Sequence, residues 1–129
     1  MRIHHIGYLV KKIDKAKKVF TTLGFQTNTA PVYDSYRKIT ICFMEKDGYQ
    51  VALVSPASTD SIVSGLINKY RNTPYHLCYS TVDFDSKLKT LAQEGFTQIG
   101  EPCIAPAIDN RRVVFLFNSA IGLIELLEE

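Results

Sequence analysis

The chain has 129 residues, 46% of them hydrophobic and 22% charged, a balance typical of one globular domain rather than a disordered chain. Its net charge of +2 is too small to predict a nucleic-acid-binding face, and three cysteines without CxxC spacing argue against a disulfide framework or a zinc finger. No apolar run approaches the about 18 residues of a membrane span, and no signal-peptide pattern is present. We therefore expect a soluble protein of the cytoplasm.

The first half of the chain predicts a strand, a helix and three further strands. Asp14 is placed to cap the helix and Gly24 to end it, because Asp accepts free amide hydrogens and Gly adopts a left-handed conformation readily. Asp47 and Gly48 favour a tight turn between the last two strands. The expected strands cover residues 3–10, 25–32, 37–45 and 50–54.

The same order of elements starts again after a short helix expected at residues 59–70. A second helix is capped by Asp85 and ended by Gly95, and the strand after it is interrupted at Pro102. The expected strands of this half cover residues 75–81, 96–104, 111–117 and 123–127.

The second half repeats the first. At an offset of 71 (76 − 5), His5 lies over His76, and the same offset superposes the two cap aspartates and the two helix-ending glycines. Near the end of each half the offset is 73 (125 − 52), and Ala52 lies over Glu125. Internal repetition outweighs local patterns in a fold prediction.

The repeat predicts an α+β fold of two βαβββ modules forming a curved, mostly antiparallel sheet around a cleft. The modules cover about residues 1–56 and 73–129, and a helical connection at 57–72 joins them. Each module is too small to bury a good core alone. The cleft therefore forms either within one chain or between two chains of a dimer.

Three residues of the predicted strands are candidate metal ligands. His5 and His76 are equivalent in the repeat, and Glu125 stands between apolar residues, where a carboxylate is costly unless it is paired or bound to a metal. Two histidines and a carboxylate suit a divalent ion such as Zn, Ni, Co, Mn or Fe(II), which would polarise a carbonyl or stabilise an enediolate. A single strand histidine is more often structural, and it is the pairing across the repeat that favours the metal site.

Other polar groups carry weaker predictions. Arg111 and Arg112 would clamp a carboxylate or phosphate, or would simply begin a solvated strand. Cys78 shares a strand face with His76 and would line the pocket, or would serve as a small buried hydrophobe. Five lysines between residues 11 and 18 are interpreted as the solvated face of the first helix.

Four stretches resemble the vicinal oxygen chelate superfamily, which includes glyoxalase I, methylmalonyl-CoA epimerase, extradiol dioxygenases and bleomycin-resistance proteins. They are His4–Val10, Tyr75–Ser80, Val113–Phe117 and Gly122–Leu126. The resemblance covers residues 1–129 as one domain. It implies the glyoxalase/bleomycin-resistance fold, a small-molecule substrate and a homodimer, with neither nucleic acid nor membrane as partner.

In glyoxalase I and the epimerase, the resemblance implies four metal ligands, one from the first and last strand of each half. His5, His76 and Glu125 match three of them, but the second, normally Glu or Gln, falls on Ala52. Gln50 lies two residues earlier on the same face and is a substitute ligand.

The favoured function is therefore a metal-dependent lyase or isomerase acting on a hemithioacetal or an acyl thioester, with Glu125 also as the catalytic base. One alternative is a resistance-type binding protein without turnover, which Ala52 favours. A second alternative is an Fe(II)-dependent oxygenase-like enzyme.

Overall fold

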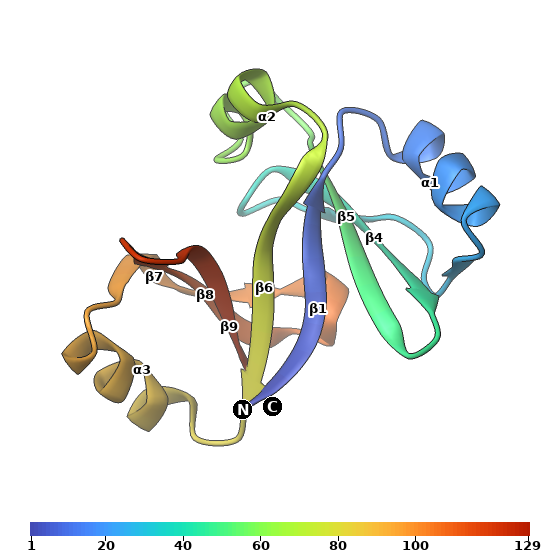
Figure 1. Cartoon of the computed structure of the whole chain (residues 1–129). Coiled ribbons are helices and arrows are strands. Elements are labelled where there is room, and N and C mark those ends of the chain that lie inside the picture. Colours follow the sequence, from blue (N-terminus) through green and yellow to red (C-terminus); the bar gives the residue numbers. More distant parts are fainter. The chain divides into compact units, whose positions relative to one another are not determined.

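A computed structural model describes residues 1–129, which form three α-helices, one 3₁₀ turn and nine strands. The chain divides into two compact units (Figure 1). The first unit is His5–Tyr75, and the second unit consists of Met1–His4 and His76–Glu129. None of the three helices is long and apolar enough to cross a membrane.

The first unit is a sheet of five strands with one helix packed on it. In its sheet β1 and β5 run parallel, β4 and β5 run antiparallel, and the short strands β2 and β3 both pair with β4. Helix α2 follows β5. The elements that lie wholly or mostly in this unit are β1 (Arg2–Leu9), α1 (Ile13–Thr22), β2 (Gln26–Thr27), β3 (Val32–Asp34), β4 (Ile39–Lys46), β5 (Tyr49–Pro56) and α2 (Ser64–Tyr70).

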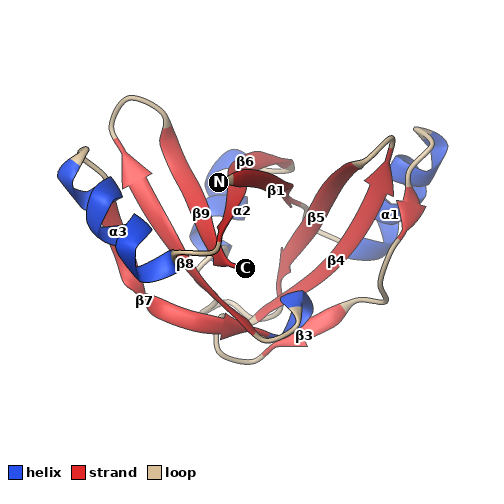
Figure 2. Ribbon diagram, turned by 90° about the horizontal axis from the view of Figure 1, so that it is seen from below, coloured by secondary structure: helices blue, strands red, loops and turns tan.

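The second unit repeats this arrangement (Figure 2). Strands β6 and β9 run parallel, whereas β8 pairs antiparallel with both β9 and β7. The elements are β6 (Thr73–Thr81), α3 (Phe84–Gln93), β7 (Thr97–Ala105), the 3₁₀ turn (Pro106–Ile108), β8 (Arg111–Asn118) and β9 (Gly122–Glu128). The predicted α+β fold of two βαβββ modules is confirmed, and most strand pairs within each unit are antiparallel.

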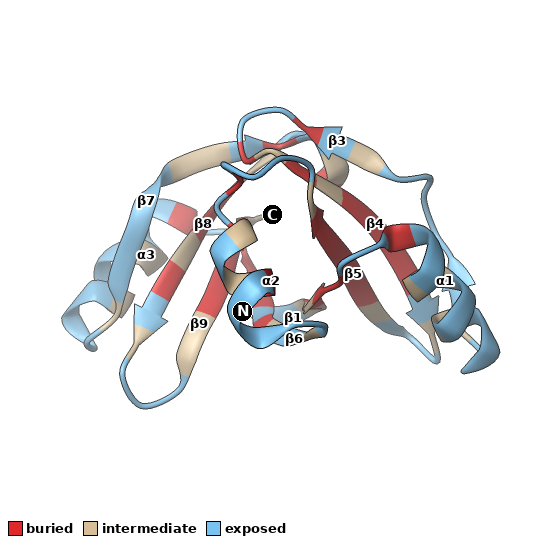
Figure 3. Ribbon diagram, turned by 90° about the horizontal axis from the view of Figure 1, so that it is seen from above, coloured by how far each residue is buried: buried red, intermediate tan, exposed pale blue.

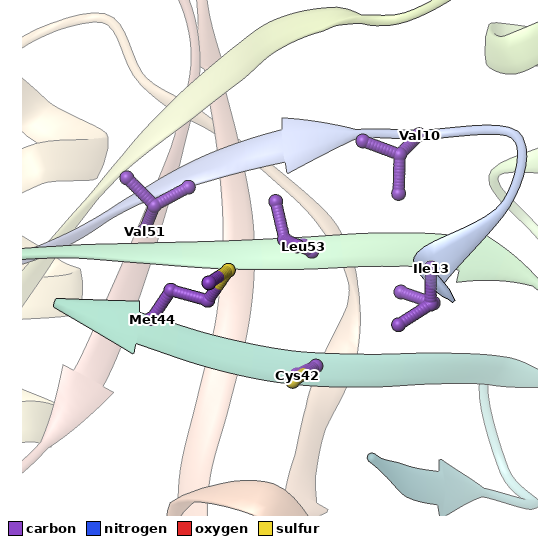
Figure 4. Packing of buried hydrophobic residues seen from close by; sticks show 6 residues of the cluster. All are labelled: Val10, Ile13, Cys42, Met44, Val51 and Leu53. Carbon is purple, nitrogen blue, oxygen red and sulfur yellow. The ribbon is translucent and has the colours of Figure 1, made fainter. Parts of the chain in front are cut away.

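Each unit buries one face of its sheet under its helix. Buried residues gather along β4, β5, β8 and β9, whereas β7 is largely exposed (Figure 3). Under α1 the core consists of aliphatic and sulfur-containing side chains from β4, β5, α1 and the end of β1 (Figure 4). Burial raises the pKa of the Cys42 thiol in this core, which keeps it neutral. Tyr8 and Tyr79 pack against the two helix-covered cores, as the alternation of side chains along a strand predicts.

The helix ends follow the prediction more closely than the helix starts. Gly24 and Gly95 end the helices with φ of +99° and +91°, a conformation that costs glycine little. The predicted N-caps are wrong, because α1 begins at Ile13 and α3 at Phe84, and neither helix has a side-chain cap. Both first residues are buried in the core, so their burial sets the helix start. Asp14 and Asp85 lie in the first turns instead, where their negative charges interact favourably with the positive end of the helix dipole.

Two strand predictions are corrected. The strand predicted at 25–32 forms two short pieces, β2 and β3, because Pro31 has no amide hydrogen to continue the ladder. In contrast, β7 continues through Pro102, and its pairing with β8 shifts register between Ile99 and Cys103. Gly100, with φ of +74°, absorbs this irregularity.

The helix predicted at 59–70 begins only at Ser64. The residues before it are held in turns by side-chain contacts. Asp60 pairs with Lys38, and the Ser61 hydroxyl donates to the Arg37 carbonyl oxygen at 3.1 Å. These contacts replace the backbone hydrogen bonds that a longer helix would make.

Candidate functional site

A buried histidine–glutamate pair lies on the sheet face of the second unit that α3 does not cover. His76 on β6 is 6% exposed and Glu125 on β9 is 2% exposed. The His76 Nε2 atom lies 3.5 Å from the Glu125 Oε1 atom. This separation exceeds that of an ordinary N–H···O hydrogen bond.

The strand pattern explains why both side chains point to this face. Ile124 and Leu126 pack into the core beneath α3, so Glu125 between them must point to the opposite face. Tyr79 on β6 also packs beneath α3, which places Cys78 and His76 on the same face as Glu125. Residues Cys78 and Glu125 are direct partners in the β6–β9 ladder.

Phe115 forms an apolar wall beside the pair. Its ring lies edge-on to the His76 ring, with centroids 5.1 Å apart and an interplanar angle of 78°, and it stands opposite Glu125 in the β8–β9 ladder. A carboxylate removed from water in such surroundings is destabilising unless a cation or hydrogen-bond donors compensate it. The site therefore favours a positively charged partner for Glu125.

The pair fits a divalent metal ion. Imidazole nitrogen and carboxylate oxygen are both ligands of zinc and of related transition metals. Two such ligands about 2.1 Å from a tetrahedral ion lie about 3.4 Å from each other, which matches the observed 3.5 Å. The donor types and their spacing are thus those of two neighbouring metal ligands.

The first unit carries an incomplete copy of this arrangement. His5 is 2% exposed, and its ring lies edge-on to Phe43 at 5.2 Å and 86°. Ala52 pairs with Gly7 in the β1–β5 ladder and with Phe43 in the β4–β5 ladder. These are the ladder positions that Glu125 occupies in the second unit, so a buried methyl group stands where the second unit has its carboxylate.

Gln50 lies two residues before Ala52 on β5, at the rim of the same strand face. It is half-buried and stands opposite Glu45 in the β4–β5 ladder. Its Oε1 atom accepts a hydrogen bond of 3.5 Å from the Asn28 side chain. This contact is long for a hydrogen bond.

The two predicted arginines have different surroundings. Arg112 lies on the helix-covered side, stacked over the Phe84 ring at 4.6 Å and bonded to Asp85 and Glu128. The hydrogen bonds from Arg112 and its positive charge lower the pKa of both carboxyl groups, and the hydrogen bonds to the two carboxylates raise the pKa of the guanidinium. Arg111 alternates to the other face, and its Nε donates to the Ile108 carbonyl oxygen at 3.3 Å. The structure thus brings together His76, Cys78 and Glu125, and it places Arg112 in a surface ion cluster on the far side of the sheet.

The sequence reasoning missed Phe43 and Phe115, which contact the two histidines. The signal was present, since the two phenylalanines are 72 residues apart (115 − 43), between the repeat offsets of the other matched positions.

Comparisons with known proteins agree with this description. Among solved structures, a hypothetical protein from Bacillus halodurans C-125 is 20% identical, with 99% of this chain and 94% of that chain covered and a TM-score of 0.87. The methylmalonyl-CoA epimerase of Mycobacterium tuberculosis is 21% identical, with 98% and 87% covered and a TM-score of 0.85. A variant of the Streptomyces coelicolor epimerase, bound to 2-nitronate-propionyl-CoA, is 20% identical, with 100% and 94% covered and a TM-score of 0.86. At this identity the likeness shows the fold.

A search of curated proteins finds no match. The sequence model of one family matches residues 4–115, which span most of the chain, the first half of the repeat and the second half as far as Phe115. This match confirms the resemblance inferred from the strand motifs. The chain belongs to the Glyoxalase/Bleomycin resistance protein/Dioxygenase superfamily.

Proposed function

We propose that this protein is a divalent-metal-dependent lyase or isomerase of the glyoxalase and epimerase type, acting on a small hemithioacetal or acyl thioester. The observation that carries the proposal is the buried pair of His76 and Glu125, whose ligand atoms lie 3.5 Å apart. Membership of the superfamily supports the same reading, as does the fold shared with methylmalonyl-CoA epimerases.

In this proposal His5, His76 and Glu125 hold the metal ion, and Gln50 is the substitute for the donor that Ala52 lacks. A divalent ion bound there would supply a Lewis acid for a substrate carbonyl. The chain contributes the orientation of the ligands. Phe43 and Phe115 each pack edge-on against one of the two imidazole rings.

Glu125 is also the residue that we propose to move the proton. Abstraction of a proton next to a carbonyl needs a base within hydrogen-bond reach. Glu125 is the carboxylate on the strand face that carries His76 and Cys78, and it lies 3.5 Å from the His76 ring.

A second candidate function is sequestration of a small molecule without turnover. It is favoured by Ala52, which is fully buried and offers no donor atom where the second unit has a carboxylate. In that case the same strand faces would bind the ligand, and no base would be required.

Metal content and turnover, measured together, test the proposal. Protein purified without chelator is analysed by inductively coupled plasma mass spectrometry and assayed with methylmalonyl-CoA and with methylglyoxal plus a thiol. We expect about one divalent ion per chain, and both metal and turnover lost in His76→Ala and Glu125→Gln. Glu128→Gln, the same change on the same strand in the Arg112 cluster, is the matched control and should retain the metal.

Each other outcome has a distinct meaning. Substoichiometric metal in the parent protein would overturn the metalloenzyme reading. Stoichiometric metal without turnover of either substrate would favour sequestration. Iron together with oxygen consumption would favour the oxygenase-like alternative.

A further inference from the structure

We propose that the first unit has a second binding site, a basic groove beside α1 that takes a small organic anion with an apolar body. The groove has a volume of about 520 Å³, within the range of pockets that bind small molecules. Its lining combines cationic, apolar and amide side chains: Tyr8, Val10, Lys11, Lys12, Lys15, Ala16, Val19, Phe20 and Asn72.

All the charged residues that line the groove are positive. Lys11, Lys12 and Lys15 are exposed at its edge, none of the nine lining residues is acidic, and no ion pair is formed by these three ammonium groups. The remaining lysines of the helix lie on another side of α1. They belong to a separate hollow lined by Asp14, Lys17, Lys18 and Thr21. The five lysines therefore do not form one uniform solvated face, and three of them converge on the groove.

The floor of the groove is apolar. The rings of Tyr8 and Phe20 meet edge-on at 5.2 Å and 84°, and Val10 is buried next to them. Val19 is 61% exposed, an apolar side chain that a ligand would remove from water. Positive charge at the edge and apolar surface below match an anion that carries an aliphatic or aromatic portion.

The internal repeat provides a built-in comparison. At the offset of 71, the positions of Lys11, Lys12 and Lys15 are occupied in the second unit by Val82, Asp83 and Ser86. Residues 11–23 contain five lysines and one aspartate, whereas the equivalent residues 82–94 contain two lysines and three acidic residues. Both helices cover the same face of equivalent sheets. The fold therefore does not require these lysines, and a separate binding role accounts for them.

The groove is distinct from the proposed metal site. Tyr8 lies three residues after His5 on β1, and side chains alternate along a strand. The groove therefore opens on the face of β1 opposite to His5. Its occupancy can be tested whether or not the chain is a metalloenzyme.

The test is a nuclear magnetic resonance titration of the full-length ¹⁵N-labelled protein. Octanoate is the probe, inorganic phosphate supplies charge alone, and octanol supplies the apolar chain alone. We expect saturable shifts from octanoate at the amides of residues 8–20 and 72. The double variant Lys12→Glu/Lys15→Glu should raise the octanoate dissociation constant by about tenfold, and Val19→Asn should weaken binding without changing the fold.

The matched control is Lys87→Glu/Lys89→Glu, which makes the same charge change on α3. It should alter the dissociation constant less than about twofold. Shifts that are absent or fall elsewhere, equal loss in the control, or phosphate binding as tight as octanoate would each overturn the proposal. Binding only to vesicles of anionic phospholipid would also overturn it, since that result would assign the lysines to a membrane surface.

Discussion

Replacing Glu125 by glutamine removes a buried negative charge while keeping the size and shape of the side chain. Without metal, the change should alter the free energy of unfolding by less than about 1.5 kcal/mol. Glutamine keeps the shape of the side chain and removes the desolvation cost of a buried carboxylate. That gain offsets the attraction to neighbouring groups that is lost with the charge.

With metal, the same variant should differ clearly from the parent. At a metal concentration about 100 times the dissociation constant, binding stabilises the parent by about 2.7 kcal/mol. Loss of a ligand should weaken binding about 100-fold, which leaves the variant with about 0.4 kcal/mol at the same concentration. The difference of about 2.3 kcal/mol corresponds to about 8 °C in the melting temperature of a chain this long.

Thermal unfolding followed by circular dichroism, in chelator and in each divalent metal, measures both quantities. Glu128→Gln controls for the loss of a charge on β9 and should gain stability with metal as the parent does. An equal gain in Glu125→Gln and the parent would refute the assignment of Glu125 as a ligand. No gain in the parent with any metal would refute the site itself.

Three further predictions concern the repeat and its surface. Ala52→Glu supplies a carboxylate where the other unit has one, so metal affinity measured by chelator competition should rise about tenfold or more. An unchanged affinity would show that residue 52 does not contact the metal. Arg112 holds the pKa of Asp85 and Glu128 below their ordinary values of 3.8 and 4.5. The two ionised carboxylates therefore stabilise the folded protein above those values, and this stabilisation is lost as the pH falls through the lowered pKa values. Arg112→Gln should therefore destabilise the protein more at pH 7 than at pH 2 in urea unfolding, and an equal loss at both would contradict the linkage. Gly95→Ala adds a Cβ atom to a residue whose backbone φ is +91°, and the nearest atom to that Cβ is 3.6 Å away. The strain therefore comes from the backbone, and we expect the free energy of unfolding measured in urea to fall by about 1 kcal/mol. An unchanged midpoint of urea unfolding would contradict this prediction.

The architecture was accessible from the sequence because local signals agreed with the repeat. Gly24 and Gly95 end their helices with positive φ, and Asp47 and Gly48 form the expected turn, also with positive φ. Alternation along the strands places Tyr8 against the helix-covered core. These features depend on neighbours in sequence, which a pattern can describe.

The sequence did not predict the first residues of the helices, the break between β2 and β3, or the side of the sheet on which Arg112 lies. Burial of Ile13 and Phe84 sets where the helices begin, and burial depends on residues distant in the chain. Arg112 could face a substrate or a helix, and only the packing of Phe84 and the nearby carboxylates decides between them.

For the candidate site, the sequence by itself determined the residue types and their equivalence: two strand histidines at one offset, and Glu125 over Ala52. A repeat fixes which positions correspond, because equivalent modules fold alike. Only the tertiary structure decided that the His76 and Glu125 ligand atoms lie 3.5 Å apart. It also decided that phenylalanines on β4 and β8 contact the histidines, and that three lysines line one groove. Those facts depend on strand register and helix packing, which bring together residues that no sequence spacing connects.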